Sequence, residues 1–560
     1  MIKTFPSDIE IAQDANIQPI SSIANALKIP ARYVEPYGHY KAKLSLDLLD
    51  TEKVTENNLI LVTSINPTPA GEGKTTVSIG LTDGLRRIGK ESIAVLREPS
   101  LGPVFGIKGG AAGGGYSQVI PMEDINLHFT GDFHAIEKAN NLLSAAIDNN
   151  LQSKTRSLQI DPNTILWKRA MDMNDRSLRQ IVVGIGGKAN GITREDGFNI
   201  TPASEIMAIL CLAESFSDLK ARLGAIYIAD DIYGEPVYAR DLNVVGAMAI
   251  LLKDAIKPNL VQTLENTPVI LHGGPFASIA QGTNSVIATK MGLSLSEYVV
   301  TEAGFGADLG AEKFLHIKCG ASGLRPKTTV LVVTVRALRH HGCATKDEYG
   351  TPNLSRVKEG FANVEKHIEN LKKFGMTSVV AINTFPEDSV SEVTFIKEAC
   401  EKLGITAVTS DGFANGGKGC TELAHAVVEA IEDKSSNFKM LYDRDLPVSE
   451  KITTLAKEIY GAREVFYSAK AIQQMETLKK NGFDRYPICM VKTPSSLSDD
   501  PKAIGRPEDF EITVREFEVA AGAGFVLPIL GDTLRMPGLP TVPAAEGMDI
   551  DDNGVISGLS

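Results

Sequence analysis

Cysteine is scarce in this sequence and is never paired at short range. The 560 residues include only six cysteines, and none of them forms a C-x-x-C pair. Disulfide frameworks and zinc sites both need cysteines at short, recurring spacings. The pattern therefore favours reduced, mostly structural thiols. These are Cys211, Cys319, Cys343, Cys400, Cys420 and Cys489.

Long apolar runs and an excess of positive charge are also missing. No stretch approaches the ~18 apolar residues of a membrane-spanning helix, and the first ten residues lack the apolar core of a signal peptide. Because the net charge is −12, a general surface for nucleic acid or an anionic membrane is not expected. We therefore predict a cytoplasmic protein without nucleic-acid or membrane partners, in which local glycine loops and a few basic side chains bind anionic ligands.

What the sequence has is length and apolar content. A chain of 560 residues with 43% hydrophobic residues can bury a large core but is too long for one simple domain. We expect a large nucleotide-binding domain over residues 1–350, which begins with a helical segment, and an α/β domain over residues 351–465. A smaller C-terminal domain would cover residues 466–560.

One stretch has the layout of a phosphate-binding loop. Residues 59–65 are a short apolar run typical of a buried parallel strand, and apolar residues recur at helical spacing beyond residue 76. Between them, Gly71 and Gly73 allow a tight turn that leads into Lys74 and Thr75. Backbone N–H groups at such a helix start bind phosphates, while the Lys reaches the outer phosphates and the Thr hydroxyl can hold Mg²⁺.

This stretch departs from the usual pattern at one position, because Thr68 stands where a glycine is expected six residues before the Lys. The strand before the loop and the helix after it favour nucleotide binding over an ordinary surface loop. The predicted nucleotide-binding residues are Thr68, Pro69, Ala70, Gly71, Glu72, Gly73, Lys74, Thr75 and Thr76.

A second predicted strand, residues 92–96, runs directly into Arg97 and Glu98. In open α/β sheets, ligands bind at the edge formed by the carboxyl ends of the strands. Lys74 and Arg97 should therefore converge on one crevice. Further strand-like runs alternate with helical ones, so we predict an α/β fold with a doubly wound, mostly parallel sheet and a P-loop-like nucleotide site.

Two phenylalanines follow neighbouring predicted strands. Phe385 comes just after residues 378–383, and Phe413 comes just after residues 405–409. Two aromatic rings at this edge could enclose a flat heterocycle by offset stacking. They could equally cap the hydrophobic core, and the sequence leaves both possibilities open.

Two further segments are typical of hairpins. Residues 225–231 resemble a Walker B strand that ends in two aspartates, but the turn and apolar run that follow favour a hairpin. Towards the C-terminus, residues 511–519 and 525–530 flank Ala-Ala-Gly-Ala-Gly, which predicts an antiparallel hairpin. The C-terminal domain is therefore expected to be antiparallel.

Six long strings along the chain are specific enough to carry a resemblance. They are Thr68–Thr76, Arg97–Tyr116, Pro121–Asp132, Lys257–Pro268, Thr301–Gly310 and Met536–Pro540. Together they resemble the formate–tetrahydrofolate ligase (formyltetrahydrofolate synthetase) family, and the chain length resembles its monofunctional form. The resemblance implies a homotetrameric enzyme of one-carbon metabolism. It would convert Mg-ATP, formate and tetrahydrofolate into 10-formyltetrahydrofolate, ADP and phosphate through formyl phosphate.

The resemblance also implies roles for particular residues. Lys74 and Thr75 would hold the nucleotide phosphates and Mg²⁺, and the planar guanidinium of Arg97 would grip formate and then formyl phosphate. Phe385 and Phe413 would lie around the pterin, so residues 351–465 would contribute to the folate site. Relatives often carry Trp at the second of these positions, and Phe413 departs from that pattern.

Glu98 and Asp132 would hold the monovalent cation that the family uses, K⁺ or NH₄⁺. Reasoning from the residues alone leaves other activities open. An amide-forming ligase or a dethiobiotin-synthetase-like carboxylase would use ATP with a different acceptor. A nucleotide-switched carrier would turn over ATP slowly whether or not formate is present.

Overall fold

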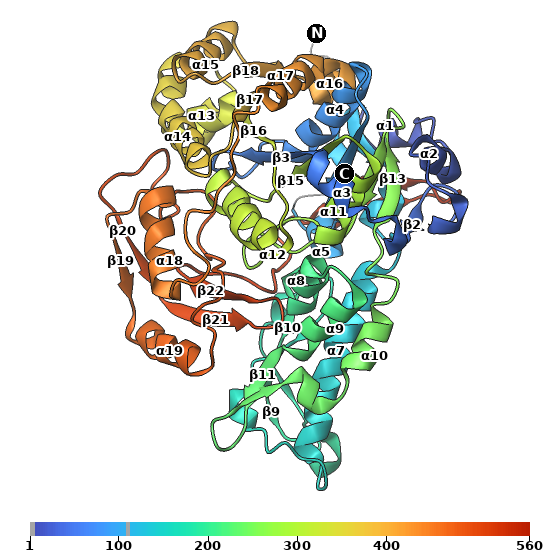
Figure 1. Ribbon diagram of the computed structural model, residues 1–560, viewed down its shortest axis with the longest axis vertical. Helices are drawn as coiled ribbons and strands as arrows, with labels where there is room; N and C mark the ends of the chain where they lie inside the picture. Colours follow the sequence, from blue (N-terminus) through green and yellow to red (C-terminus); the bar gives the residue numbers. More distant parts are fainter. Residues whose placement is uncertain (1–5, 108–111, 560) are drawn as a thin grey trace.

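A large sheet forms the centre of the computed structural model, which describes residues 6–107 and 112–559 (Figure 1). Twelve strands of the described chain belong to this sheet. Ten of them follow one path, in the order β1 (Val34–Pro36), β2 (Ala42–Leu44), β13 (Asn259–Thr263), β14 (Pro268–Leu271), β4 (Ser92–Leu96), β15 (Tyr298–Glu302), β3 (Asn58–Ser64), β16 (Thr328–Val333), β17 (Ser378–Asn383) and β18 (Ala407–Ser410). The other two, β5 (Gly113–Gly114) and β6 (Ser117–Ile120), pair with each other, and β6 also pairs with β13.

Seven neighbouring strands, from β14 to β18 along this path, run parallel to one another. The strands at the other end, β1, β2 and β13, pair antiparallel. The prediction of a mostly parallel α/β sheet is therefore confirmed. One detail was not predicted: β15 lies between β3 and β4, the strands that precede Lys74 and Arg97.

Helices cover both faces of the parallel part of the sheet. Ile60 and Val62 of β3 pack with α4 (Lys74–Arg87) and α17 (Thr421–Glu432) in one apolar cluster. The alternate residues Leu59 and Leu61 belong to a second cluster with α11 (Val286–Leu295) and α14 (Leu354–Lys373). Both faces are buried because successive side chains of a strand point to opposite sides.

A helical lobe extends below the sheet in Figure 1 and has its own apolar cluster. Its helices are α7 (Asp132–Gln152), α8 (Glu205–Leu212), α9 (Phe216–Gly224) and α10 (Val245–Leu251). Three two-stranded sheets flank them: β7 (Arg169–Ala170) with β10 (Phe198–Asn199), β8 (Ile181–Val183) with β9 (Arg194–Asp196), and β11 (Tyr227–Asp230) with β12 (Pro236–Tyr238). The β11–β12 pair is antiparallel, so the predicted hairpin is confirmed.

A C-terminal lobe, orange to red in Figure 1, contains α18 (Val448–Leu455) and α19 (Ala469–Lys480). The predicted antiparallel hairpin is confirmed as β21 (Glu516–Ala520) and β22 (Phe525–Ile529). The predicted strand 511–519 is split, however. Its first part, β20 (Glu511–Val514), leaves the hairpin and pairs parallel with β19 (Glu464–Tyr467), so this lobe mixes parallel and antiparallel pairs. The last pair, β23 (Asp549–Ile550) and β24 (Ile556–Ser557), is antiparallel.

Two observations bear on the expected division of the chain. β17 and β18 lie beyond residue 350 yet extend the same sheet as β16, and β1 and β2 join this sheet from the N-terminal segment that was expected to be helical. The domain boundaries stay a prediction.

The remaining α-helices are α1 (Asp8–Gln13), α2 (Ile20–Ala26), α3 (Thr51–Glu56), α5 (Leu101–Phe105), α6 (Met122–Asn126), α12 (Gly320–Ser322), α13 (Val335–His341), α15 (Val390–Lys402) and α16 (Gly412–Asn415). No helix in the described ranges has the length and apolar character needed to span a membrane.

Candidate functional site

The glycine loop, residues 65–73, connects β3 to α4. The strand ends at Ser64 and the helix begins at Lys74, so both predicted elements are confirmed. Gly71 and Gly73 have φ angles of 76° and 73°, in the left-handed region that glycine enters without strain. Gly73 is the N-cap of α4, and the N–H groups of the first helical turn are free of intrahelical partners, as at every helix start. The loop can therefore offer backbone donors to an anion.

Two side chains predicted to bind nucleotide bond to each other. The Glu72 side chain is buried, and its Oε1 accepts hydrogen bonds from Thr68 N (2.7 Å) and Thr68 Oγ1 (2.9 Å). Its Oε2 accepts from the Thr334 hydroxyl. Thr68 and Glu72 thus shape the loop from inside, while Pro69 and Ala70 are exposed.

Lys74 and Thr75 lie at the start of α4, with Thr76 half-buried after them. Lys74 Nζ is 3.3 Å from Ser64 Oγ at the end of β3. Thr75 Oγ1 donates to the carboxylate of Glu302, at 3.0 Å from Oε2 and 3.2 Å from Oε1. Glu302 is the last residue of β15 and is almost fully buried.

Sequence reasoning missed Glu302, although the signal was present. Residues 298–302 are a short, strand-like run, and the rule that singled out Arg97 at a strand's carboxyl end applies equally to Glu302. What the sequence did not reveal is that β15 lies between the two strands of interest.

Arg97 follows β4 and lies beside the end of β15. Its Nη1 donates to the Pro275 carbonyl at 3.4 Å, and a Cβ built on Gly304 would lie 3.4 Å from the same nitrogen. Arg97 Nε is buried without a hydrogen-bond partner among the described residues. Thr75 and Arg97 therefore follow β3 and β4, and Glu302 ends β15, which lies between them, so the three residues belong to the carboxyl-end edge of three adjacent parallel strands.

Glu98 and Asp132 are brought together around one amide. Asn259 Nδ2 donates to Glu98 Oε1 (3.1 Å) and to Asp132 Oδ2 (2.8 Å). Lys43 Nζ lies 2.8 Å from Asp132 Oδ1, and both members of this ion pair are buried. Burial, followed by the negative charge of Asp132, raises the pKa of Glu98 well above its ordinary value. The cluster holds two carboxyl groups against one ammonium group.

Phe385 and Phe413 follow β17 and β18, which are parallel neighbours. The backbone N–H of Phe385 donates to Asp388 Oδ2 at 2.8 Å. Phe413 lies in α16 and is 36% exposed, and its carbonyl accepts from Tyr116 N at 2.8 Å. A Cβ on Gly114 would lie 3.4 Å from the Phe413 ring. Phe413 therefore packs against the β5–β6 hairpin, which follows Arg97 in the sequence. The glycine-rich residues 108–111, which precede this hairpin, lie outside the described residues.

The first polar residue of the glycine loop, Asn66, is held by a buried network that we call the Asn66 joint: Asn66, Asp308, His341, Asn363 and Lys492. Asn66 Nδ2 donates to Asp308 Oδ1 (3.1 Å), and Asn66 Oδ1 accepts from Asn363 Nδ2 (2.9 Å). The Asn66 carbonyl lies 2.8 Å from His341 Nε2. Lys492 Nζ pairs with Asp308 Oδ2 at 2.9 Å, and both side chains have no exposed surface. The joint ties the glycine loop to α14 and to the C-terminal lobe.

Comparison with protein families decides which family this site belongs to. A family model described as formate–tetrahydrofolate ligase matches residues 6–560, nearly the whole chain. The chain belongs to the formate–tetrahydrofolate ligase family. It is therefore an ATP-dependent ligase of one-carbon metabolism, which joins formate to tetrahydrofolate.

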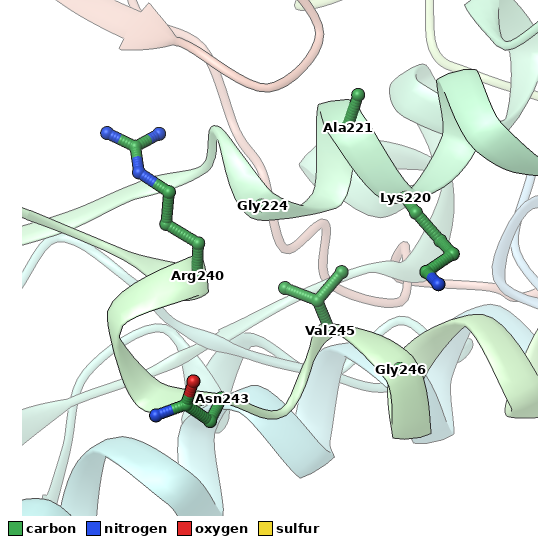
Figure 2. A pocket seen from close by; sticks show the side chains of 7 residues that line it. All are labelled: Lys220, Ala221, Gly224, Arg240, Asn243, Val245 and Gly246. Carbon is green, nitrogen blue, oxygen red and sulfur yellow. The ribbon is translucent and has the colours of Figure 1, made fainter.

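Two hollows of this ligase lie away from the sheet edge that carries Thr75, Glu302 and Arg97. One, of about 470 Å³, lies between α9 and α10 in the helical lobe (Figure 2). Its lining residues are Lys220, Ala221, Gly224, Arg240, Asn243, Val245 and Gly246. The other, of about 450 Å³, is lined by residues of α2, α4 and α11 and of the segments that follow them, including Arg86 and Lys90. No residue predicted to bind a substrate of the ligase lines either hollow.

Proposed function

We propose that the edge formed by the ends of β3, β15 and β4 binds ATP and formate side by side and that formyl phosphate forms there. The observation that carries this proposal is the placement of Thr75, Glu302 and Arg97 at the carboxyl ends of three adjacent parallel strands. A phosphate held by the glycine loop and a carboxylate held by Arg97 would then meet at one edge of the sheet.

The nucleotide would be held by the start of α4, where backbone N–H groups face its phosphates and Lys74 reaches the outer ones. Thr75 and Glu302 would hold Mg²⁺. This donor set fits the ion, because Mg²⁺ prefers hard oxygen ligands and usually takes one or two protein groups besides the phosphates. When bound, the metal would neutralise charge on the transferring phosphoryl group.

Formate would bind to Arg97, whose Nε has no protein acceptor among the described residues. A formate oxygen attacks the γ-phosphorus of ATP, the bond to the bridging oxygen breaks, and ADP leaves with that electron pair. The N10 lone pair of tetrahydrofolate then attacks the formyl carbon, the C–O bond breaks, and inorganic phosphate leaves as N10 loses its proton. The guanidinium would stabilise the charge that develops on the formyl phosphate oxygens.

Phe385 and Phe413 would flank the pterin ring, with stacking worth about 0.5–1.5 kcal/mol per aromatic pair. Glu98 and Asp132 would hold a monovalent cation. Because Lys43 already places a positive charge against Asp132, Glu98 would be the main ligand of that cation. A homotetramer, which the family resemblance implies, and a cytoplasmic location complete the proposal.

The formyl phosphate step can be tested with formate labelled by ¹⁸O. If a formate oxygen attacks phosphorus, one labelled oxygen must appear in the inorganic phosphate, which mass spectrometry detects. Label that stays entirely in 10-formyltetrahydrofolate and in free formate would exclude the intermediate. The control is a reaction without tetrahydrofolate, in which little labelled phosphate should be released beyond the first turnover.

A further inference from the structure

The start of α13 is fastened to the glycine loop by two side chains. Thr334 is the N-cap of this helix, and its hydroxyl donates to Glu72. Two residues further on, Arg336 Nη2 donates to the carbonyl of Gly71 at 3.1 Å. The loop that would carry the nucleotide phosphates is therefore bonded to the element that follows β16, not only to its own strand and helix.

Arg336 also contacts Phe385. Its guanidinium carbon lies 5.4 Å from the centroid of the Phe385 ring, within the range of a cation–π interaction. One guanidinium thus touches both the glycine loop and the predicted pterin platform. Its Nε is buried and has no hydrogen-bond partner in the described part of the chain, so the Arg336 guanidinium, which contacts both the glycine loop and Phe385, keeps one unused donor.

A second link runs along β17. Asn383, the last residue of this strand, donates from Nδ2 to the Glu72 carbonyl at 3.1 Å. The amide packs closely on Gly73, where an added Cβ would lie 2.4 Å from Asn383 Nδ2. Phe385 stands only two residues further along the chain. A shift of the loop at Glu72 or Gly73 must therefore also move the backbone that carries the ring.

We propose that Arg336 is a positioning residue that couples the nucleotide site to the pterin site. The inference rests on the proposed function, because it takes the glycine loop and Phe385 as the two ligand-binding elements. Whichever ligand binds first would fix the Gly71–Arg336–Phe385 chain of contacts and would bear the cost of ordering it. The second ligand would then bind more tightly, and the effect must be reciprocal.

The test is calorimetric titration of the full-length protein with tetrahydrofolate, with and without a saturating non-hydrolysable ATP analogue and Mg²⁺. For the unsubstituted chain we expect the analogue to raise the affinity for tetrahydrofolate by a factor within the usual range of about 5–150. Arg336→Met should reduce this factor to below about 2, because it removes both contacts. Arg336→Lys should keep part of it, since an ammonium group can donate to Gly71 but lacks a planar face.

Arg325 offers a matched control. It donates from Nη2 to the Phe438 carbonyl at 2.7 Å, and its guanidinium lies 5.5 Å from the Phe438 ring. Arg325→Met therefore removes the same kinds of contact away from the site and should leave the coupling factor unchanged. A purely structural effect of losing an Arg–Phe contact would alter both variants alike.

The outcomes separate the inference from the proposed function. If the coupling survives Arg336→Met, the role of Arg336 alone is overturned. The same holds if the unsubstituted chain binds both ligands without any coupling between them. Failure of the unsubstituted chain to bind the analogue or tetrahydrofolate would overturn the site itself. If Arg336→Met does not fold, as judged by its circular dichroism and unfolding temperature, the decision passes to Arg336→Lys, which must show a smaller factor than the unsubstituted chain.

Discussion

The ligand edge of the sheet and the Asn66 joint both contain buried charged groups, but these groups are satisfied in different ways. At the joint, the Asp308 carboxylate is matched by the Lys492 ammonium, and Asn66 is bonded through its side chain and its backbone carbonyl. At the edge, Arg97 keeps a buried nitrogen without an acceptor in the described chain. Unpaired polar atoms in protein interiors are costly. The joint therefore contributes to stability, whereas the edge retains binding capacity for a ligand.

The pKa values at the joint agree with this difference. Burial alone would raise the pKa of Asp308, but the Lys492 ammonium and the nearby His367 together outweigh it, and the net shift is downward. Burial lowers the pKa of His341 to about 3, so this imidazole stays neutral and Nε2–H can donate to the Asn66 carbonyl while Nδ1 accepts from Gly505 N. Neither group should change its charge near neutral pH.

The largest expected effect is that of Arg97→Ser, which removes the guanidinium from the edge. We expect turnover to fall by about 10³-fold or more, because one preorganised donor at a charged transition state contributes about 10²–10³ and a guanidinium offers several. The affinity for ATP and the unfolding temperature should change little. Steady-state assays, nucleotide titration and thermal unfolding measure the three quantities, and near-normal synthesis would refute the role of Arg97.

For Lys492→Met at the joint, we expect a loss of stability and not of turnover. The substitution leaves the buried Asp308 charge without its ammonium partner, which should lower the free energy of unfolding by about 3–5 kcal/mol. Denaturant unfolding measures the loss. Lys502→Met, at an exposed lysine of the same segment, should stay within about 0.5 kcal/mol. A loss below about 1 kcal/mol in the first variant would show that the buried pair is not what secures the joint.

Asp83 is a buried carboxyl that forms no ion pair with the described residues and has no proposed ligand role. Burial raises its pKa to about 7 from an ordinary value of 3.8, and Thr263 Oγ1 donates to it at 2.8 Å. Between these two pH values the folded chain binds more protons than the unfolded one, so the free energy of unfolding falls as pH rises. By about pH 7 the loss should amount to about 2–4 kcal/mol.

Asp83→Asn cannot ionise and should remove this decline. The measurement is the denaturant midpoint of both proteins from pH 4 to pH 8. The variant should gain stability relative to the unsubstituted chain as pH rises through this window and keep the gain above pH 7. Parallel curves would mean that the pKa of Asp83 is the same in the folded and unfolded chains, so that burial does not raise it.

The smallest effect is expected from enlarging a ring at the ligand edge. Phe413→Trp should lower the KM for tetrahydrofolate by about 2–10-fold, which corresponds to about 0.5–1.5 kcal/mol of added stacking, and should leave kcat and the KM for ATP unchanged. Phe466→Trp, at an exposed position of β19, provides the control. An unchanged KM in the first variant would argue that Phe413 caps the core and does not contact the pterin.

The sequence predicted the parallel strands well because each is a compact apolar run. β4 and β17 begin and end at the predicted residues, and β3 and β18 lie within two residues of theirs. The order of the strands was not accessible, because the insertion of β15 between β3 and β4 depends on packing between distant segments. For the same reason the antiparallel end of the sheet, built from β1, β2 and β13, was not foreseen.

The residues of the candidate site also fall into those that local sequence patterns predicted and those that only the tertiary fold revealed. Lys74, Thr75 and Arg97 were found because they sit at strand ends in a recognisable local pattern. The side chains that bond to the glycine loop were not found, since Arg336 and Asn383 lie more than 250 residues away from it in the sequence. The Asn66 joint spans comparable distances, with Lys492 and Asp308 separated by 184 positions. Local patterns identify groups that meet ligands, while the groups that hold them in place depend on the tertiary fold.

The distribution of the thiols has a practical consequence. Cys343 is exposed while the other five cysteines are buried, and burial raises the pKa of Cys211, Cys319, Cys400 and Cys420 to about 12. A maleimide dye should therefore attach at one position without any engineering. That position follows α13, the helix whose first turn grips the glycine loop, so a fluorophore placed there would report on movements of that helix as substrates bind.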